Sequence, residues 1–169
     1  MRMANISNIY IRKKFKNYPD TNKHLYICKK NYFMYPEAMV SPMKKELTSK
    51  NFKELLTATD VDSAIKQSGV TLIFVNSVCG CAAGSARPGV VLSLLGAKSP
   101  NHLATVFAGV DKDSVAQVRK YLLPYPPSSP SIALFKDGKL VHFIERHQIE
   151  GRSAEMLAEH LKEVYNQYC

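Results

Sequence analysis

The sequence predicts an α/β sandwich, with a central mixed sheet of four strands flanked by helices. Two observations lead to this prediction. Short apolar runs, typical of buried strands, alternate with segments that repeat apolar residues at helical spacing. Two further apolar runs are separated only by Asp137-Gly138, a strong hairpin signal, and a last amphipathic segment follows them. This order is typical of parallel strands joined by crossover helices and completed by an antiparallel pair.

Each element can be assigned to a stretch of sequence, and from residue 70 onwards the order is β-α-β-α-β-β-α. Strands are predicted at 70–75, 103–108, 131–136 and 139–145. Helices are predicted at 82–96, 111–122 and 153–165, and two more precede the first strand, at 36–49 and 59–68. Thr59-Asp60 is expected to cap the helix at 59–68, and Ser153 the last helix. Pro42 is expected to mark a kink or the first turn of its helix, and Pro88 to bend the helix at 82–96.

Positive charge is concentrated at the N-terminus. The chain of 169 residues has a net charge of +9, but residues 1–33 hold eight Lys or Arg and one acidic residue, whereas residues 34–169 hold fifteen and thirteen. A nearly neutral domain argues against a basic nucleic-acid-binding face. We therefore divide the chain into a basic extension, 1–33, and one domain, 34–169. The extension is expected to be disordered or to be upstream sequence from a mis-assigned start, although its interleaved aromatic residues would also suit stacking on a nucleic acid.

Neither a membrane span nor a secretory signal is predicted. No apolar run approaches 18 residues, and residues 1–33 lack the apolar core and cleavage site of a signal peptide. The chain has four cysteines. In the reducing cytoplasm, closely spaced cysteines are catalytic or metal-binding rather than structural. We expect a cytoplasmic protein.

Cys79 and Cys81 stand one residue apart, between the predicted strand at 70–75 and the helix at 82–96. The start of a helix carries unpaired N–H groups and a partial positive charge, which stabilise a thiolate, the reactive form of cysteine. The two cysteines can also form a disulfide, because their Cα atoms can approach within the bridgeable range and Gly80 makes the tight backbone turn accessible. A ring this small is strained, so we expect an oxidising pair.

Three interpretations of this cysteine pair stand side by side: a redox pair, two buried thiols that never react, and part of a zinc or copper site. No second Cys or His cluster follows at zinc-site spacing, so we assign no metal ligand. In the redox interpretation Cys79, at the end of the strand, is the exposed attacking thiolate. Cys81 then resolves the mixed disulfide, although the one-residue spacing also permits the reverse assignment.

Pro130 is the second element of the candidate site. The predicted order of elements resembles the thioredoxin fold, in which the matching proline is cis and faces the thiol pair. In that fold the backbone of the preceding residue, here Ser129, pairs with the substrate. Gly80, Ser129 and Pro130 are therefore the substrate-binding candidates. The alternative is a trans proline in a proline-rich loop, since cis X-Pro bonds are a small minority.

Four basic side chains are weaker candidates for stabilising a thiolate or binding an acidic thiol: Arg87, His142, Arg146 and His147. His142 is better explained as a hydrogen-bonded or solvent-facing residue of a strand, and residues 145–147 as the solvated end of that strand. Cys169 is expected to be an exposed thiol, with a resolving role through a mobile terminus as the alternative. Cys28 lies in the extension.

With these residues identified, the chain resembles the bacilliredoxins, small thioredoxin-fold proteins of bacteria that use bacillithiol. The resemblance spans about residues 34–169. Its most specific part is the run Cys79-Gly80-Cys81-Ala82-Ala83-Gly84. Further matching stretches lie at 76–88, 106–109, 127–131 and 141–151, together with Cys169.

The resemblance implies a thiol–disulfide oxidoreductase that removes bacillithiol from protein cysteines. Carried onto this chain, Cys79 attacks the mixed disulfide and takes the small thiol onto itself, while Cys81 resolves that bond or tunes Cys79. The implied partners are bacillithiolated or disulfide-bearing proteins and a low-molecular-weight thiol as co-substrate. No cofactor, nucleic acid or membrane is implied. The alternatives are a general protein disulfide isomerase or reductase, and a non-enzymatic module that binds a metal or senses oxidants.

Overall fold

The structure is a computed structural model that describes residues 35–169. The predicted basic extension, 1–33, with Cys28 lies outside the described residues, so the expectations about it remain predictions.

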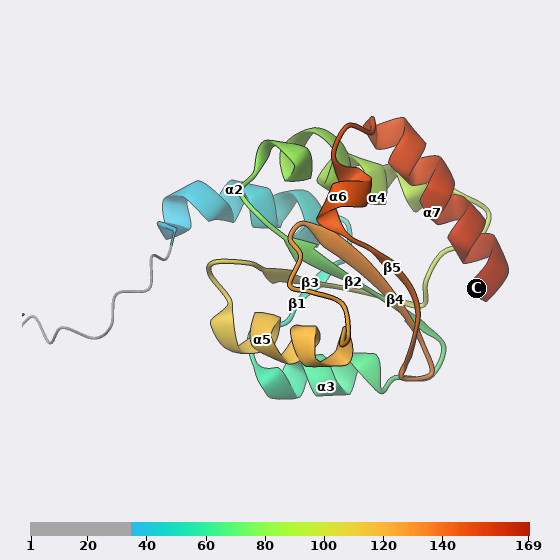
Figure 1. Ribbon diagram of the computed structural model, residues 1–169, viewed down its shortest axis with the longest axis horizontal. Coiled ribbons are helices and arrows are strands. Elements are labelled where there is room, and N and C mark those ends of the chain that lie inside the picture. The colour runs from blue at the N-terminus through green and yellow to red at the C-terminus, as the bar shows by residue number, and fades with distance from the viewer. Residues whose placement is uncertain (1–34) are drawn as a thin grey trace, which may run out of the picture. The chain divides into compact units, whose positions relative to one another are not determined.

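Helices and strands alternate along the described part of the chain (Figure 1). The first half consists of α2 (Glu37–Thr48), β1 (Lys53–Glu54), α3 (Ala58–Ile65), β2 (Val70–Asn76), η2 (Ala82–Ala86) and α4 (Arg87–Ser93). The second half consists of β3 (His102–Phe107), α5 (Lys112–Tyr121), β4 (Ser131–Lys136), β5 (Lys139–Ile144), α6 (Arg146–Ile149) and α7 (Ala154–Tyr168). The fold class is the predicted thioredoxin-like α/β sandwich.

The strands form one mixed sheet in the order β1-β3-β2-β4-β5. Strands β1, β3 and β2 are parallel, and β4 and β5 join them as an antiparallel pair. Figure 1 shows α2, α4 and α7 on one face of the sheet and α3 and α5 on the other. The carboxyl end of β2, at the centre of this sheet, is where the Cys79–Cys81 segment begins.

Strand β2 is buried along its whole length because helices cover both of its faces. Leu72 and Phe74 belong to the apolar core under α4 and α7, whereas Ile73 and Val75 belong to the core under α3 and α5. This explains why the strand is apolar at every position from Leu72 to Val75 rather than at alternate positions. The segment that follows is therefore attached to the most buried strand of the sheet.

The sheet has five strands rather than the predicted four. The additional strand, β1, has only two residues, and these pair with Ala104 and Thr105 of β3. The start of α3 also differs from the prediction, because Thr57 rather than Thr59-Asp60 is the N-cap. Thr57 Oγ1 accepts the N–H of Asp60, and the Asp60 carboxylate accepts the N–H of Thr57, which forms a capping box.

The helix after the cysteines changes its winding before Pro88. Residues Ala82–Ala86 form a π-helical turn, and the N–H of Arg87 donates to the carbonyl of Ala82, five residues earlier. A proline within a helix clashes with the carbonyl four residues before it, and a widened turn relieves this clash. The distortion predicted at Pro88 therefore takes the form of a π turn next to the thiols. In α2, by contrast, Pro42 lies inside a helix that begins at Glu37, so Pro42 does not mark its first turn.

Candidate active site

Cys79 occupies the position of a helix N-cap, directly after the buried strand β2. Its carbonyl accepts the N–H groups of Ala82 and Ala83, and its sulfur accepts the N–H of Ala82 at 3.4 Å. A serine or aspartate oxygen usually accepts this hydrogen bond at an N-cap. The helix start therefore directs an N–H donor at Cys79, as the position of the pair in the sequence predicted.

The two thiols are free, half-buried and in direct contact. The sulfur atoms of Cys79 and Cys81 lie 2.7 Å apart. The hydroxyl of Ser77 donates to the Cys79 sulfur at 3.1 Å, and the N–H of Cys79 donates back to the Ser77 oxygen at 3.3 Å. The sulfur of Cys79 thus receives hydrogen bonds from Ser77, from the Ala82 backbone and from the neighbouring thiol.

These contacts separate the pKa values of the two thiols. Partial burial opposes ionisation of Cys79, but the hydrogen bonds from Cys81, Ser77 and the Ala82 N–H, with the charge of Arg146, outweigh it and lower the pKa of Cys79. The pKa of Cys81 is raised by partial burial and by its hydrogen bond and charge interaction with Cys79. The two shifts have the directions expected if Cys79 is the attacking thiol, and the assignment of roles to Cys79 and Cys81 stays a prediction.

Arg146 supplies the positive charge that acts on both sulfurs. It is the first residue of α6, a helix that the sequence prediction missed because residues 145–147 were interpreted as the end of a strand. The N–H of Arg146 donates to Ser128 Oγ at 2.7 Å, and the Gln148 side chain accepts the N–H of Glu145 at 2.9 Å. These two hydrogen bonds fix the start of α6 beside the loop that precedes β4.

Arg87 is buried and binds the backbone and side chains at the start of the thiol segment. Its side chain is only 3% exposed, and its Nε donates to Glu46 of α2 at 2.7 Å. One terminal nitrogen donates to Asn76 Oδ1 at 3.3 Å and to the carbonyl of Ser77 at 3.1 Å. The structure thus shows Arg87 as a positioning residue that ties α2 and α4 to the end of β2, which differs from the two roles predicted for it.

Pro130 lies at the same end of the sheet as the thiols. Ser131, the first residue of β4, pairs with Val75 of β2, so Pro130 comes next to the end of β2. The Ser129–Pro130 bond is cis, as expected from the fold, and Pro130 is buried whereas Ser129 is half-buried. Gly80 is exposed, and a Cβ at this position would meet no atom within 4 Å. A binding role for these three residues remains a prediction.

The two remaining basic candidates, His142 and His147, contact partners other than the thiols. His142 of β5 contacts His160 of α7, with their Nε2 atoms 3.1 Å apart, which confirms the interpretation as a hydrogen-bonded strand residue. His147 is exposed and lies 3.7 Å from the carboxylate of Glu145.

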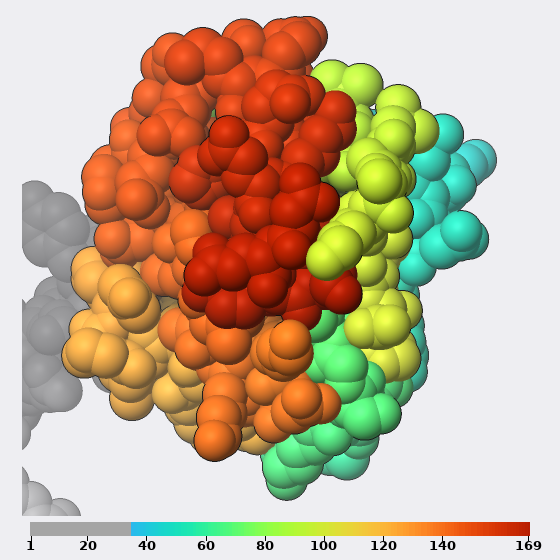
Figure 2. All heavy atoms as spheres, turned by 90° about the vertical axis from the view of Figure 1, so that its right-hand side faces the viewer, coloured from blue at the N-terminus to red at the C-terminus, as the bar shows by residue number. Residues whose placement is uncertain are grey.

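Cys169, at the end of α7, lies at the opposite end of the sheet. Lys136 donates to the carbonyl of Tyr168 at 2.9 Å, and Lys136 pairs with Val70, the first residue of β2. Figure 2 shows the end of α7 beside the β4–β5 hairpin and the segment after α4. The length of β2, seven residues, places Cys169 roughly 20 Å from the thiol pair. A resolving role within the same molecule therefore does not agree with this arrangement.

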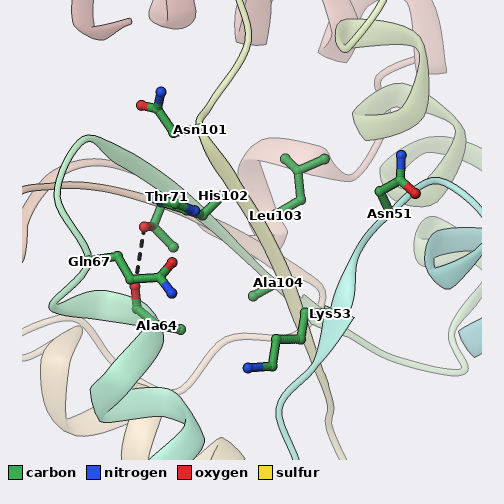
Figure 3. A pocket seen from close by; sticks show the side chains of 9 residues that line it. All are labelled: Asn51, Lys53, Ala64, Gln67, Thr71, Asn101, His102, Leu103 and Ala104. Carbon is green, nitrogen blue, oxygen red and sulfur yellow. Dashed lines mark hydrogen bonds between the residues drawn. The ribbon is translucent and has the colours of Figure 1, made fainter.

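A polar pocket of about 250 Å³ lies near the amino ends of β2 and β3 and next to β1, at the far end of the sheet from the thiols (Figure 3). Asn51, Gln67, Asn101 and His102 are among the residues that line it, and neither Cys79 nor Cys81 does. Among residues 35–169, no group of three or more His, Cys, Asp or Glu side chains is placed to hold a metal ion. No helix within the same range is long and apolar enough to cross a membrane.

Comparison with known proteins identifies the family of this chain. A family model described as disulphide isomerase matches residues 35–169. A bacilliredoxin from Cytophaga hutchinsonii is 62% identical over 134 residues, which are 79% of this chain and 99% of that protein. The chain belongs to the bacilliredoxin family. A second bacilliredoxin, from Halalkalibacterium halodurans, is 52% identical over 82% of this chain and 97% of that protein.

Among solved structures, oxidised thioredoxin from Plasmodium falciparum matches with a TM-score of 0.48 and 18% identity, over 69% of this chain and 97% of that one. Membership of this family makes the protein an enzyme of thiol–disulfide exchange. The sequence-based prediction of a thiol–disulfide oxidoreductase is thus confirmed, as is the family.

Proposed function

We propose that this protein removes bacillithiol from mixed disulfides on protein cysteines, with Cys79 as the attacking thiolate. One observation carries the proposal: Cys79 accepts hydrogen bonds from Ser77, the Ala82 N–H and Cys81, and these lower its pKa. A lowered pKa increases the fraction of Cys79 that is present as thiolate, the nucleophilic form of cysteine. The names of the similar bacilliredoxins support the assignment of the small thiol.

The reaction needs only thiol–disulfide exchange. The Cys79 thiolate attacks the sulfur of the small thiol, a new S–S bond forms, and the protein cysteine leaves as a thiolate. Cys81, whose sulfur lies 2.7 Å away, can then attack Cys79, release the small thiol and leave a Cys79–Cys81 disulfide. In this scheme Cys81 resolves the intermediate; if it only tunes Cys79, a second thiol must release the bound one. In this proposal the substrate binds beside Gly80, Ser129 and Pro130. The reaction uses no resident cofactor and takes place in the cytoplasm.

A second candidate function is isomerisation of protein disulfides, favoured by the description of the matching family. The same Cys79 thiolate would then attack a disulfide between two cysteines of one protein. The two functions differ in the group that remains on Cys79: a low-molecular-weight thiol in the first, a protein chain in the second.

The test is a trapping experiment with Cys81→Ser, which stops the reaction after the first exchange. A protein that carries bacillithiol on a single cysteine is incubated with this variant, and intact mass is measured. We expect the mass of one bacillithiol on the variant, lost when Cys79 is also replaced. An adduct with the whole substrate protein, or retained activity in Cys79→Ser, would contradict the assignment. Trapping of a scrambled protein instead of bacillithiol would favour isomerisation.

A further inference from the structure

The mechanism leaves Arg146 without a role beyond its charge, and its surroundings suggest one. Its side chain is 48% exposed, and its positive charge acts on both Cys79 and Cys81. Its backbone is held by Ser128, one residue before the Ser129–Pro130 bond. Arg146 is therefore held at the end of the sheet where the thiol pair lies, beside the loop that contains the cis bond.

Much of the guanidinium is available for a ligand. Nε donates to Glu150 Oε1 at 2.6 Å, the sole side-chain hydrogen bond of Arg146 within the described residues. An arginine has five N–H donors in a planar fork, so its two terminal nitrogens have no acceptor within residues 35–169. This fork matches the two oxygens of a carboxylate. The contact with Glu150 shows that this guanidinium donates a hydrogen bond to a carboxylate.

The contact with Glu150 is a weak competitor for such a ligand. It is an exposed i, i+4 pair, with the Glu150 side chain 49% exposed. Exposed pairs of this kind contribute little to stability, so an incoming carboxylate can share or replace the contact at small cost. The Glu150 carboxylate also acts on one of the thiols, because it contributes to the raised pKa of Cys81. Arg146 and Glu150 thus form a charge pair at the edge of the reacting sulfurs.

We propose that Arg146 determines specificity for the small thiol, by binding a carboxylate of an acidic low-molecular-weight thiol while Cys79 attacks that thiol's sulfur. This inference rests on the proposed function and names the chemistry by which the same site selects its co-substrate. Glu150 holds the guanidinium in place when the site is empty and competes with the substrate for it. The bonds that form and break are those of the thiol–disulfide exchange between Cys79 and the mixed disulfide.

The test uses one neutral peptide with a single cysteine, joined by a disulfide to each of three small thiols. These are 3-mercaptopropionate, 2-mercaptoethanol and cysteamine, which present a carboxylate, a hydroxyl and an ammonium group on a two-carbon spacer. The rate of transfer to Cys79 is measured in the Cys81→Ser background. Because a change in the pKa of Cys79 alters all three rates together, the ratio of the carboxylate rate to the hydroxyl rate isolates the contact with Arg146.

We expect Arg146→Gln to lower this ratio roughly fivefold and Glu150→Gln to raise it about twofold, magnitudes typical of exposed charge pairs. The wild-type ratio should fall as salt is added. The matched control is Lys162→Gln, which removes another exposed helical ion pair, with Glu159 at 2.8 Å, and should leave the ratio unchanged.

The two proposals fail in different ways. If transfer occurs but Arg146→Gln slows all three thiols by the same factor, Arg146 acts only on the thiolate, and the specificity inference is wrong while the proposed function stands. If no small thiol, bacillithiol included, is transferred to Cys79, both proposals are wrong. A lower ratio in Lys162→Gln equal to that in Arg146→Gln would show general charge rather than a contact.

Discussion

Cysteines at the two ends of the sheet have opposite chemical character in this protein. Cys79 follows the carboxyl end of β2, receives hydrogen bonds on its sulfur and has a lowered pKa. Cys169 ends α7 beside the amino end of β2, and partial burial raises its pKa despite the nearby charges of Lys98 and Lys136. Hydrogen-bond donors directed at the sulfur therefore outweigh burial at Cys79, whereas two lysines alone do not at Cys169.

The largest expected difference between the two ends is in activity. Cys79→Ser should reduce removal of a small thiol from a protein by at least about a thousandfold, because it removes the nucleophile. Cys169→Ser should leave the rate unchanged. Both are measured by release of bacillithiol from a bacillithiolated protein. A large loss in Cys169→Ser would break the comparison and indicate a resolving role between two molecules.

The second expected difference between the two ends of the sheet is in how much a substitution lowers the free energy of unfolding. Arg87→Gln removes a buried charge that binds Glu46, Asn76 and the carbonyl of Ser77, and should lower the free energy of unfolding by roughly 2–3 kcal/mol. At the other end, Lys136→Gln removes one exposed hydrogen bond to Tyr168 and should cost less than about 0.5 kcal/mol. Urea unfolding measures both. Equal losses would mean that the network of Arg87 does not hold the thiol segment.

The smallest expected effect is that of Ser77→Ala, which tests whether the hydrogen bond from Ser77 lowers the pKa of Cys79. Ser77→Ala removes a hydrogen bond that favours the thiolate, so the pKa of Cys79 should rise. Below that pKa less thiolate is present, and the alkylation rate at pH 6 to 7 should fall roughly fivefold. At high pH the variant should react at least as fast as the wild type, because a more basic thiolate is a stronger nucleophile. A uniform loss at all pH values would indicate a structural effect instead.

Much of the fold follows from local sequence signals. The buried strand β2, the Asp137-Gly138 hairpin and the Ser153 cap are all found where the sequence predicts them. Two elements were missed because they are too short to show a period. Strand β1 has two residues and is defined by pairing with β3, and α6 has four. The capping box of α6 also lacks the usual sequence signature, because its N-cap is Glu145 rather than Ser, Thr, Asp or Asn.

In the candidate site, too, some features follow from neighbouring residues in the sequence and others do not. The positions of Cys79 and Cys81 follow from sequence neighbours, since a strand end and a helix start are adjacent. The roles of Arg87 and Arg146 depend on residues far along the chain: Glu46 lies 41 positions from Arg87, and Arg146 is 67 positions from Cys79. Spacing in one sequence carries no information about such contacts. Arg146 was thus one weak candidate among four until the fold placed its charge near the sulfurs.

Hydrogen bonds at the helix start are expected to make Cys79 the most readily ionised thiol of this protein. The most direct test measures the initial rate of iodoacetamide alkylation of each cysteine in the reduced wild-type protein across pH, by mass spectrometry of peptides. We predict a midpoint for Cys79 below about 8.5, the ordinary value for cysteine. Cys169 should show a midpoint above it, and Cys81 should react after Cys79. Alkylation of Cys81 or Cys169 at a lower pH than Cys79 would contradict the account.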